Sequence, residues 1–189
     1  TIAMMLAAEK QTDFIISLAG MVISGAETLV WQNRQTLLEA GIPETTVETY
    51  CRLLSDAFDK QINGGSFPSA DQYDLPDALK QNYQAVLAQI RTPYMSHFLS
   101  LDMRQILSGI NCPVMALNGT KDIQVEAEGN LEALRKGLPA NGTNHIEPIE
   151  GVNHLFQHCD TGSVSEYRTI EETFAPEVLE KITAWISEL

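Results

Sequence analysis

Two strand-like segments separated by one helical stretch constrain the fold more than any other feature of this sequence. The segments run from Pro113 to Leu117 and from His145 to Ile149, and the stretch from Val125 to Gly137 between them is compatible with a helix. Alternation of strand and helix is typical of βαβ units, in which the strands lie parallel and the helix crosses over the sheet. The sequence therefore predicts the α/β class, with parallel strands flanked by helices.

The two ends of the chain predict further elements of the same sheet. Ile2 to Lys10 is rich in the helix formers Ala, Met and Leu. Phe14 to Val22 is a nearly continuous apolar run, the pattern of a strand that is buried on both faces. From Pro176 to Leu189 the apolar residues form one stripe along a helix, which we expect to pack on the sheet.

The middle of the chain, from about Gly25 to Gly109, has helical periodicity and no convincing strand. Pro43 suits the first turn of a helix that ends near Gly64, and a second helix is expected from about Asp77 to Ile90. Four or five helices are predicted in this block. The apolar positions of the first of them recur at three- and four-residue spacing: Val47, Cys51, Leu54 and Phe58.

The charge and the apolar runs exclude several kinds of partner. The formal net charge is −13, from 25 acidic and 12 basic residues, and no basic run is present. Nucleic acids and anionic membranes are bound by clustered Lys and Arg, so neither is expected as a partner. The longest apolar stretch, Phe14 to Ile23, is too short for the ~20 residues that cross a bilayer. The sequence does not indicate a compartment, either cytoplasmic or exported.

Candidate catalytic residues lie in the two short loops that follow the late strands. Asp122 follows the first of these strands and His154 follows the second. In parallel sheets ligands bind beyond the carboxyl ends of the strands, so the two loops are expected to be neighbours at such a site. A carboxylate that holds an imidazole through Nδ1 leaves Nε2 free to act as a general base. Each residue alone is more often structural, but the pair in this order favours catalysis.

The same residues resemble a known family. PVMALNGTKDIQV and the following NL (Pro113 to Leu131), GVNHLFQ (Gly151 to Gln157) and the approach to the last helix (Ile170 to Pro176) resemble the C-terminal region of serine-type α/β-hydrolases of the bacterial carboxylesterase kind. The resemblance implies a partial α/β-hydrolase fold, with the first helix and strand of the core in residues 1–24. It further implies an inserted helical cap in residues 25–109 and the C-terminal core in residues 110–189.

The resemblance also implies the chemistry. Asp122 matches the triad acid, His154 matches the triad base, and the substrate would be a small-molecule carboxylic ester with no cofactor required. The nucleophile elbow Gly-x-Ser-x-Gly would precede Thr1, outside this chain. None of the serines that we considered has that frame, so none is assigned as a nucleophile: Ser17, Ser24, Ser108, Ser163 and Ser165. We therefore expect this chain to be inactive when it is alone.

Two alternative functions remain open at this stage. His154 and His158 are four residues apart, with His145, Cys159 and Asp160 near them in sequence, so they could belong to a metal-dependent hydrolase if the segment were helical. The chain could instead be a non-catalytic binding module. The strand from Phe14 to Val22 would also have one unpaired edge, which predicts a homo-oligomer formed through that edge.

An odd number of cysteines, with no CxxC pair, predicts no closed disulfide framework.

Overall fold

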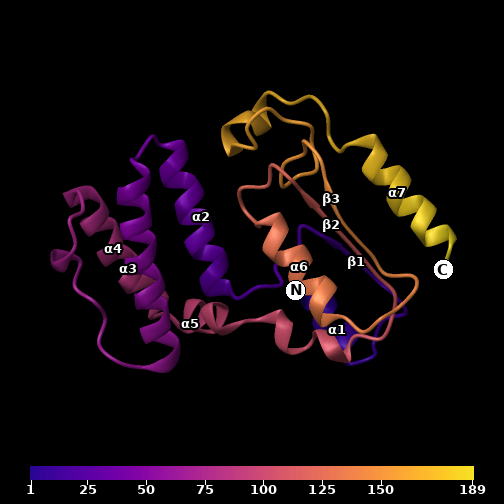
Figure 1. The fold of residues 1–189 in the computed structure, drawn as a ribbon, viewed down its shortest axis with the longest axis horizontal. Helices are drawn as coiled ribbons and strands as arrows, with labels where there is room; N and C mark the ends of the chain where they lie inside the picture. The colour runs from indigo at the N-terminus through magenta and orange to yellow at the C-terminus, as the bar shows by residue number, and fades with distance from the viewer. The chain divides into compact units, whose positions relative to one another are not determined.

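The chain forms two compact units, which we call unit 1 and unit 2. The computed structural model describes all residues from Thr1 to Leu189. Unit 1 comprises residues 1–23 and 102–189, and unit 2 comprises residues 24–101. Figure 1 labels the elements of both. Unit 2 is thus an insertion in the sequence of unit 1. Residues 102–109, which the sequence pattern groups with the helical block, belong to unit 1 and contain the 3-10 helices η2 (Met103–Gln105) and η3 (Leu107–Gly109).

Unit 1 is built on a parallel sheet of three strands. They are β1 (Ile15–Leu18), β2 (Val114–Gly119) and β3 (His145–Ile149), in the spatial order β1-β2-β3. Both pairs of neighbouring strands are parallel. The predicted α/β class is therefore confirmed. The carboxyl ends of β2 and β3 lie side by side, because Gly119 pairs with Ile149 at the end of the register.

Helices cover both faces of this sheet (Figure 1). On one side lie α1 (Ile2–Ala8) and α6 (Ala127–Gly137), and on the other lies α7 (Pro176–Ser187). Every residue of β2 is buried, as expected for a central strand between two helical layers. The core against α7 combines Met115 and Leu117 of β2 with residues of the helix such as Trp185. The 3-10 helix η4 (Val164–Arg168) precedes α7.

Strand β1 is shorter and less buried than the sequence pattern predicts. The expected run from Phe14 to Val22 is a strand only from Ile15 to Leu18, and Phe14 and Leu18 remain 40% and 41% exposed. The reason is that β1 is an edge strand, which pairs only with β2. The chain then leaves the sheet at Ala19, whose φ of 48° lies in the left-handed region.

Unit 2 is all helical, with four α-helices in the predicted block. They are α2 (Gly25–Glu39), α3 (Glu44–Asn63), α4 (Asp77–Ile90) and α5 (Pro93–Ser100), with the short 3-10 helix η1 (Ala70–Gln72) before α4. The ends follow local signals. Ser24 and Glu27 form a capping box at the start of α2, and Gly64, with a φ of +85°, ends α3.

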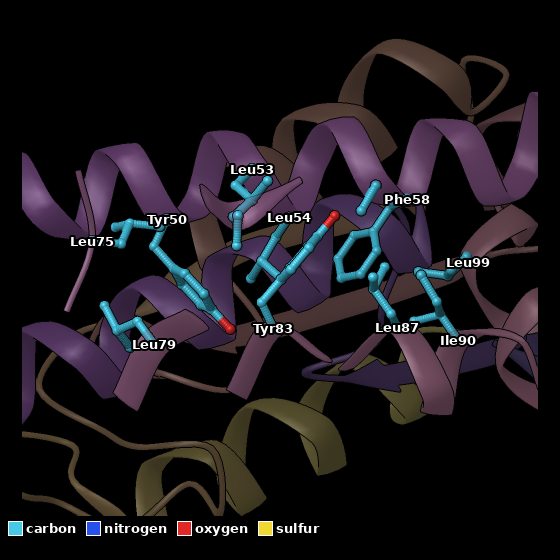
Figure 2. Close-up of a cluster of buried hydrophobic side chains, with 12 residues drawn as sticks. Tyr50, Leu53, Leu54, Phe58, Leu75, Leu79, Tyr83, Leu87, Ile90 and Leu99 are labelled. Atoms are coloured by element: carbon cyan, nitrogen blue, oxygen red, sulfur yellow. The ribbon is translucent and has the colours of Figure 1, made fainter. Parts of the chain in front are cut away.

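The core of unit 2 lies between α3 and α4, as Figure 2 shows. Leu54 and Phe58 of α3 are buried there together with the tyrosines Tyr50 and Tyr83. Both phenol groups keep a hydrogen bond: Asn82 donates to Tyr50, and Tyr83 donates to the carbonyl of Pro68. Burial raises the pKa of Tyr83 to about 12, so this hydroxyl stays protonated and acts as a donor. No helix of either unit is long and apolar enough to cross a membrane.

Candidate active site

The loop after β2 holds Asp122 in a buried turn. The backbone N–H of Asp122 donates to the carbonyl of Gly119, which folds the chain back at the end of the strand. Oδ1 of Asp122 then accepts hydrogen bonds from the backbone N–H groups of Gln124 (2.8 Å) and Val125 (2.9 Å). The Asp122 side chain has no solvent exposure. These contacts leave the second oxygen, Oδ2, for other partners.

The loop after β3 is fixed by its own hydrogen bonds. Asn153 is fully buried, and its Oδ1 accepts from the backbone N–H groups of Leu155 (2.9 Å) and Gln157 (3.1 Å). The backbone N–H of Asn153 donates in turn to the carbonyl of Gln157. Phe156 has a φ of 57°, a conformation that is uncommon outside glycine. His154 therefore lies in a loop that is closed by its own hydrogen bonds.

Direct bonds join the two loops. The backbone N–H of Thr120 donates to the carbonyl of Ile149, and that of Lys121 donates to the carbonyl of Val152. The Thr120 hydroxyl accepts from the N–H of Gly151. At Gly119 the loops approach so closely that a Cβ atom would lie 2.2 Å from the carbonyl oxygen of Val152. The glycine is thus required by the distance between the loops.

These loops bring Asp122 and His154 into contact. Nδ1 of His154 lies 2.8 Å from Oδ2 of Asp122. Because an ionised carboxylate can only accept hydrogen bonds, Nδ1 carries the proton and Nε2 carries the lone pair. Nε2 makes no hydrogen bond in the structure, and the His154 side chain is 28% exposed. The geometry is that of a general base held in one tautomer, while the catalytic roles of the pair stay a prediction.

Asn118 is a site residue that the sequence reading did not single out. It is 1% exposed, and its Nδ2 donates to Oδ2 of Asp122 (3.2 Å) and to the carbonyl of Val125 (3.0 Å). The available signal was an asparagine at the end of an apolar strand, four residues before the acid. Such a residue needs buried hydrogen-bond partners.

Two titratable side chains, Tyr167 and Cys159, lie near the loop that holds Asp122. The Gln124 side chain donates to the hydroxyl of Tyr167 (2.8 Å), which ties η4 to this loop. Burial raises the pKa of Tyr167, and the charge of Asp122 acts in the same direction. Burial also raises the pKa of the Cys159 thiol, which disfavours the thiolate form that a cysteine nucleophile needs.

The structure separates His154 from His158. The segment between them is not helical, because Val152 and His158 form an antiparallel bridge across the loop. His158 contacts Glu172 through Nδ1 (3.1 Å) and Glu177 through Nε2 (2.9 Å). The metal site considered from the sequence required His154 and His158 to lie on one face of a helix, and the structure has no helix there. No group of three or more His, Cys, Asp or Glu side chains is arranged to hold a metal ion.

Comparisons with known proteins add little to this geometry. No family model matches the chain, and no curated protein matches it. Among solved structures, a protein described as a non-heme bromoperoxidase from Mycobacterium tuberculosis matches with 14% identity and a TM-score of 0.43. The match covers 99% of this chain and 63% of that protein, so the chain spans less than two thirds of its length. At this identity the likeness does not indicate a reaction, which has to be inferred from the site residues themselves.

Proposed function

We propose that this chain supplies the acid and the histidine of a catalytic triad that hydrolyses carboxylic esters through an acyl-enzyme. The observation that supports this proposal is the contact of 2.8 Å between Nδ1 of His154 and Oδ2 of Asp122, with Nε2 unbonded. The nucleophile and the donors that stabilise the oxyanion belong, in this proposal, to sequence outside the chain. The resemblance of residues 113–131 and 151–157 to the C-terminal region of α/β-hydrolases supports this, because in that family the nucleophile precedes these segments.

The proposed reaction has two halves. As the hydroxyl oxygen of the nucleophile bonds to the ester carbon, Nε2 of His154 takes its proton. The same proton passes to the leaving alcohol when the C–O bond breaks and the acyl-enzyme remains. A water molecule then attacks the acyl carbon, and His154 takes a proton from it. As the bond between the acyl carbon and the nucleophile oxygen breaks, His154 returns this proton to that oxygen and the carboxylic acid leaves. Asp122 stays ionised throughout and stabilises the imidazolium form of His154.

We propose further that unit 2 serves as the cap of this enzyme. It is inserted between β1 and β2, which is where the resembled family carries its cap. Unit 2 has its own core, so it can keep its fold while surface residues vary. In this proposal, unit 2 selects among ester substrates, and unit 1 provides the proton transfer.

The test is ester hydrolysis by the protein with and without the residues encoded before Thr1. The long form should hydrolyse a p-nitrophenyl ester, and the chain alone should not. In the long form His154→Ala and Asp122→Asn should each lower kcat by about 10³- to 10⁴-fold, as expected when a triad histidine is lost or held in the wrong tautomer. His97→Ala, an exposed histidine of α5, serves as the control. Hydrolysis by the long form that survives His154→Ala would reject the proposal.

A further inference from the structure

Asn118 links the end of β2 to two parts of the loop that holds Asp122. Its side chain is almost completely buried at the end of β2, and both of its amide hydrogen bonds go to this loop. One goes to Oδ2 of Asp122 in the middle of the loop, and the other goes to the carbonyl of Val125, shortly before α6 begins. The two hydrogens of one amide group therefore fasten the middle and the end of the loop to the strand.

The bond to Asp122 reaches the oxygen that holds the histidine. Oδ1 is occupied by the backbone N–H groups of Gln124 and Val125, whereas Oδ2 is shared by Asn118 and His154. Apart from His154, Asn118 is the one side chain that donates to this carboxylate. If Asn118 were apolar, Oδ2 would keep only the histidine, and the loop would lose both side-chain hydrogen bonds to β2, which would leave the backbone bond from Asp122 to Gly119.

We propose that Asn118 is a positioning residue, which acts through Asp122 to keep the ring of His154 in the tautomer with the proton on Nδ1. The role of Asn118 in catalysis rests on the proposed function. The tautomer of His154, in contrast, can be measured in this chain alone. Free imidazole side chains populate both tautomers, so the bond to Asp122 has to select one of them. That selection requires the carboxylate to stay in place, which is the role assigned to Asn118.

The substitution Asn118→Leu removes the donor and keeps the side chain branched at Cγ. We expect the ¹⁵N signals of His154 at alkaline pH to change from those of an Nδ1–H ring to those of a mixture of tautomers. In the long form with the nucleophile, kcat should fall by about 10- to 100-fold with little change in KM, because a displaced base affects proton transfer rather than substrate binding. Asn118→Asp has nearly the same shape but repels Asp122, and it should produce the same spectral change if the leucine variant does not fold.

Asn130 provides the matched control. It is also 1% exposed and lies in unit 1, where its Oδ1 accepts from the N–H groups of Val22 and Ile23 and its Nδ2 donates to Glu126. Asn130→Leu should therefore destabilise the chain without changing the His154 spectrum. An unchanged His154 spectrum in both Asn118 variants would overturn the proposal, and so would an equal change in Asn130→Leu.

The two proposals can fail separately. If the long form hydrolyses no ester but Asn118→Leu still changes the tautomer of His154, the proposed function is wrong and the role of Asn118 stands. If the long form is active and its kcat falls for His154→Ala but not for the Asn118 variants, the function stands and the role of Asn118 is wrong.

Discussion

Gly119 leaves no room for a side chain between the two loops of the candidate site. A Cβ atom there would meet the backbone oxygens of Val152 at 2.2 Å and Asn153 at 2.8 Å. Backbone cannot rotate away as a long side chain can, so Gly119→Ala should push the His154 loop outward. We expect a loss of about 1–3 kcal/mol in the free energy of unfolding, measured by urea denaturation. The Nδ1–H signature of His154 should weaken in the same variant.

Gly142→Ala is the matched control for this prediction. A Cβ atom at Gly142 would have no heavy atom within 4 Å, so the free energy of unfolding should change by less than about 0.5 kcal/mol. If Gly119→Ala were as stable as Gly142→Ala, the loops would not be held together as tightly as their distances indicate.

At the residue scale, the sequence was sufficient to predict that Asp122 and His154 lie together, but not to predict the residues that hold their loops in place. The pair could be found because each follows a strand, and the carboxyl ends of neighbouring parallel strands meet at one edge. Gly119 acts through the distance between two loops that are 30 or more residues apart in sequence and are joined by bonds such as that from Lys121 to Val152. Asn118 acts through the buried turn that brings Asp122 and Val125 within reach of its side chain. No spacing rule along the chain encodes those distances.

Among the elements, α7 contacts the loop after β3 through an ion pair between Glu177 and His158, which depends on pH because the histidine must be protonated. The hydrogen bond with Glu172 raises the pKa of His158, and the charges of Glu172 and Glu177 act in the same direction. A raised pKa in the folded state contributes stability below the unfolded value of about 6.5, and this contribution is lost as pH rises through the folded value. Because His158 is half exposed, we expect the contribution to be only about 0.5 kcal/mol.

His158→Gln should therefore lower the free energy of unfolding below about pH 6.5 and have little effect at alkaline pH. Urea denaturation at several pH values measures this difference. His97→Gln is the control, since His97 is exposed on α5 and makes no ion pair in the structure. A difference between His158→Gln and the parent chain that grows with rising pH would contradict the assigned sign.

Helix α4 and strand β3 were predicted to the residue, β2 was predicted as Pro113 to Leu117 but runs from Val114 to Gly119, and β1 was predicted too long. Helix α4 begins at Asp77 after Pro76 and ends at Ile90, and β3 runs from His145 to Ile149, both as expected. The apolar run from Phe14 to Val22 indicated a strand buried on both faces, whereas β1 covers only Ile15–Leu18; the unpaired edge that we expected for this strand is present, because β1 pairs with β2 alone. Strand order depends on pairing across the sheet, which a single run of residues does not contain.

At the scale of the whole molecule, two separate cores predict two separable responses to mutation. Leu54 lies in the core of unit 2, and Leu117 lies in the core of unit 1 against α7. Leu54→Ala and Leu117→Ala should each cost about 2–5 kcal/mol in their own unit. Hydrogen exchange followed by mass spectrometry should show faster exchange in residues 24–101 for Leu54→Ala. For Leu117→Ala, the faster exchange should appear in residues 1–23 and 102–189. Equal acceleration of both units by either variant would mean that they unfold as one.

The free edge of β1 predicts self-association. Its strand pairs with β2 alone, and Leu18 at its end is 41% exposed. We propose that two copies pair through this edge, so light scattering should give more than one chain per particle. Leu18→Lys should reduce this mass, because a charge on an edge strand opposes pairing. Ile62→Lys, which is equally exposed but lies in α3, should not; a monomeric parent chain would refute the proposal.

The way in which unit 2 is attached has a consequence for protein engineering. Within unit 2, the N–H of Gly25 donates to the carbonyl of Leu101, and within unit 1 the N–H of Met103 donates to the carbonyl of Val22. The two ends of the insertion are therefore close together, and the chain leaves and rejoins unit 1 at nearly the same point. A module joined in this way can be exchanged for another of different length through a short glycine linker. Variety in the inserted part can thus arise by recombination, without redesign of the loops that hold Asp122 and His154.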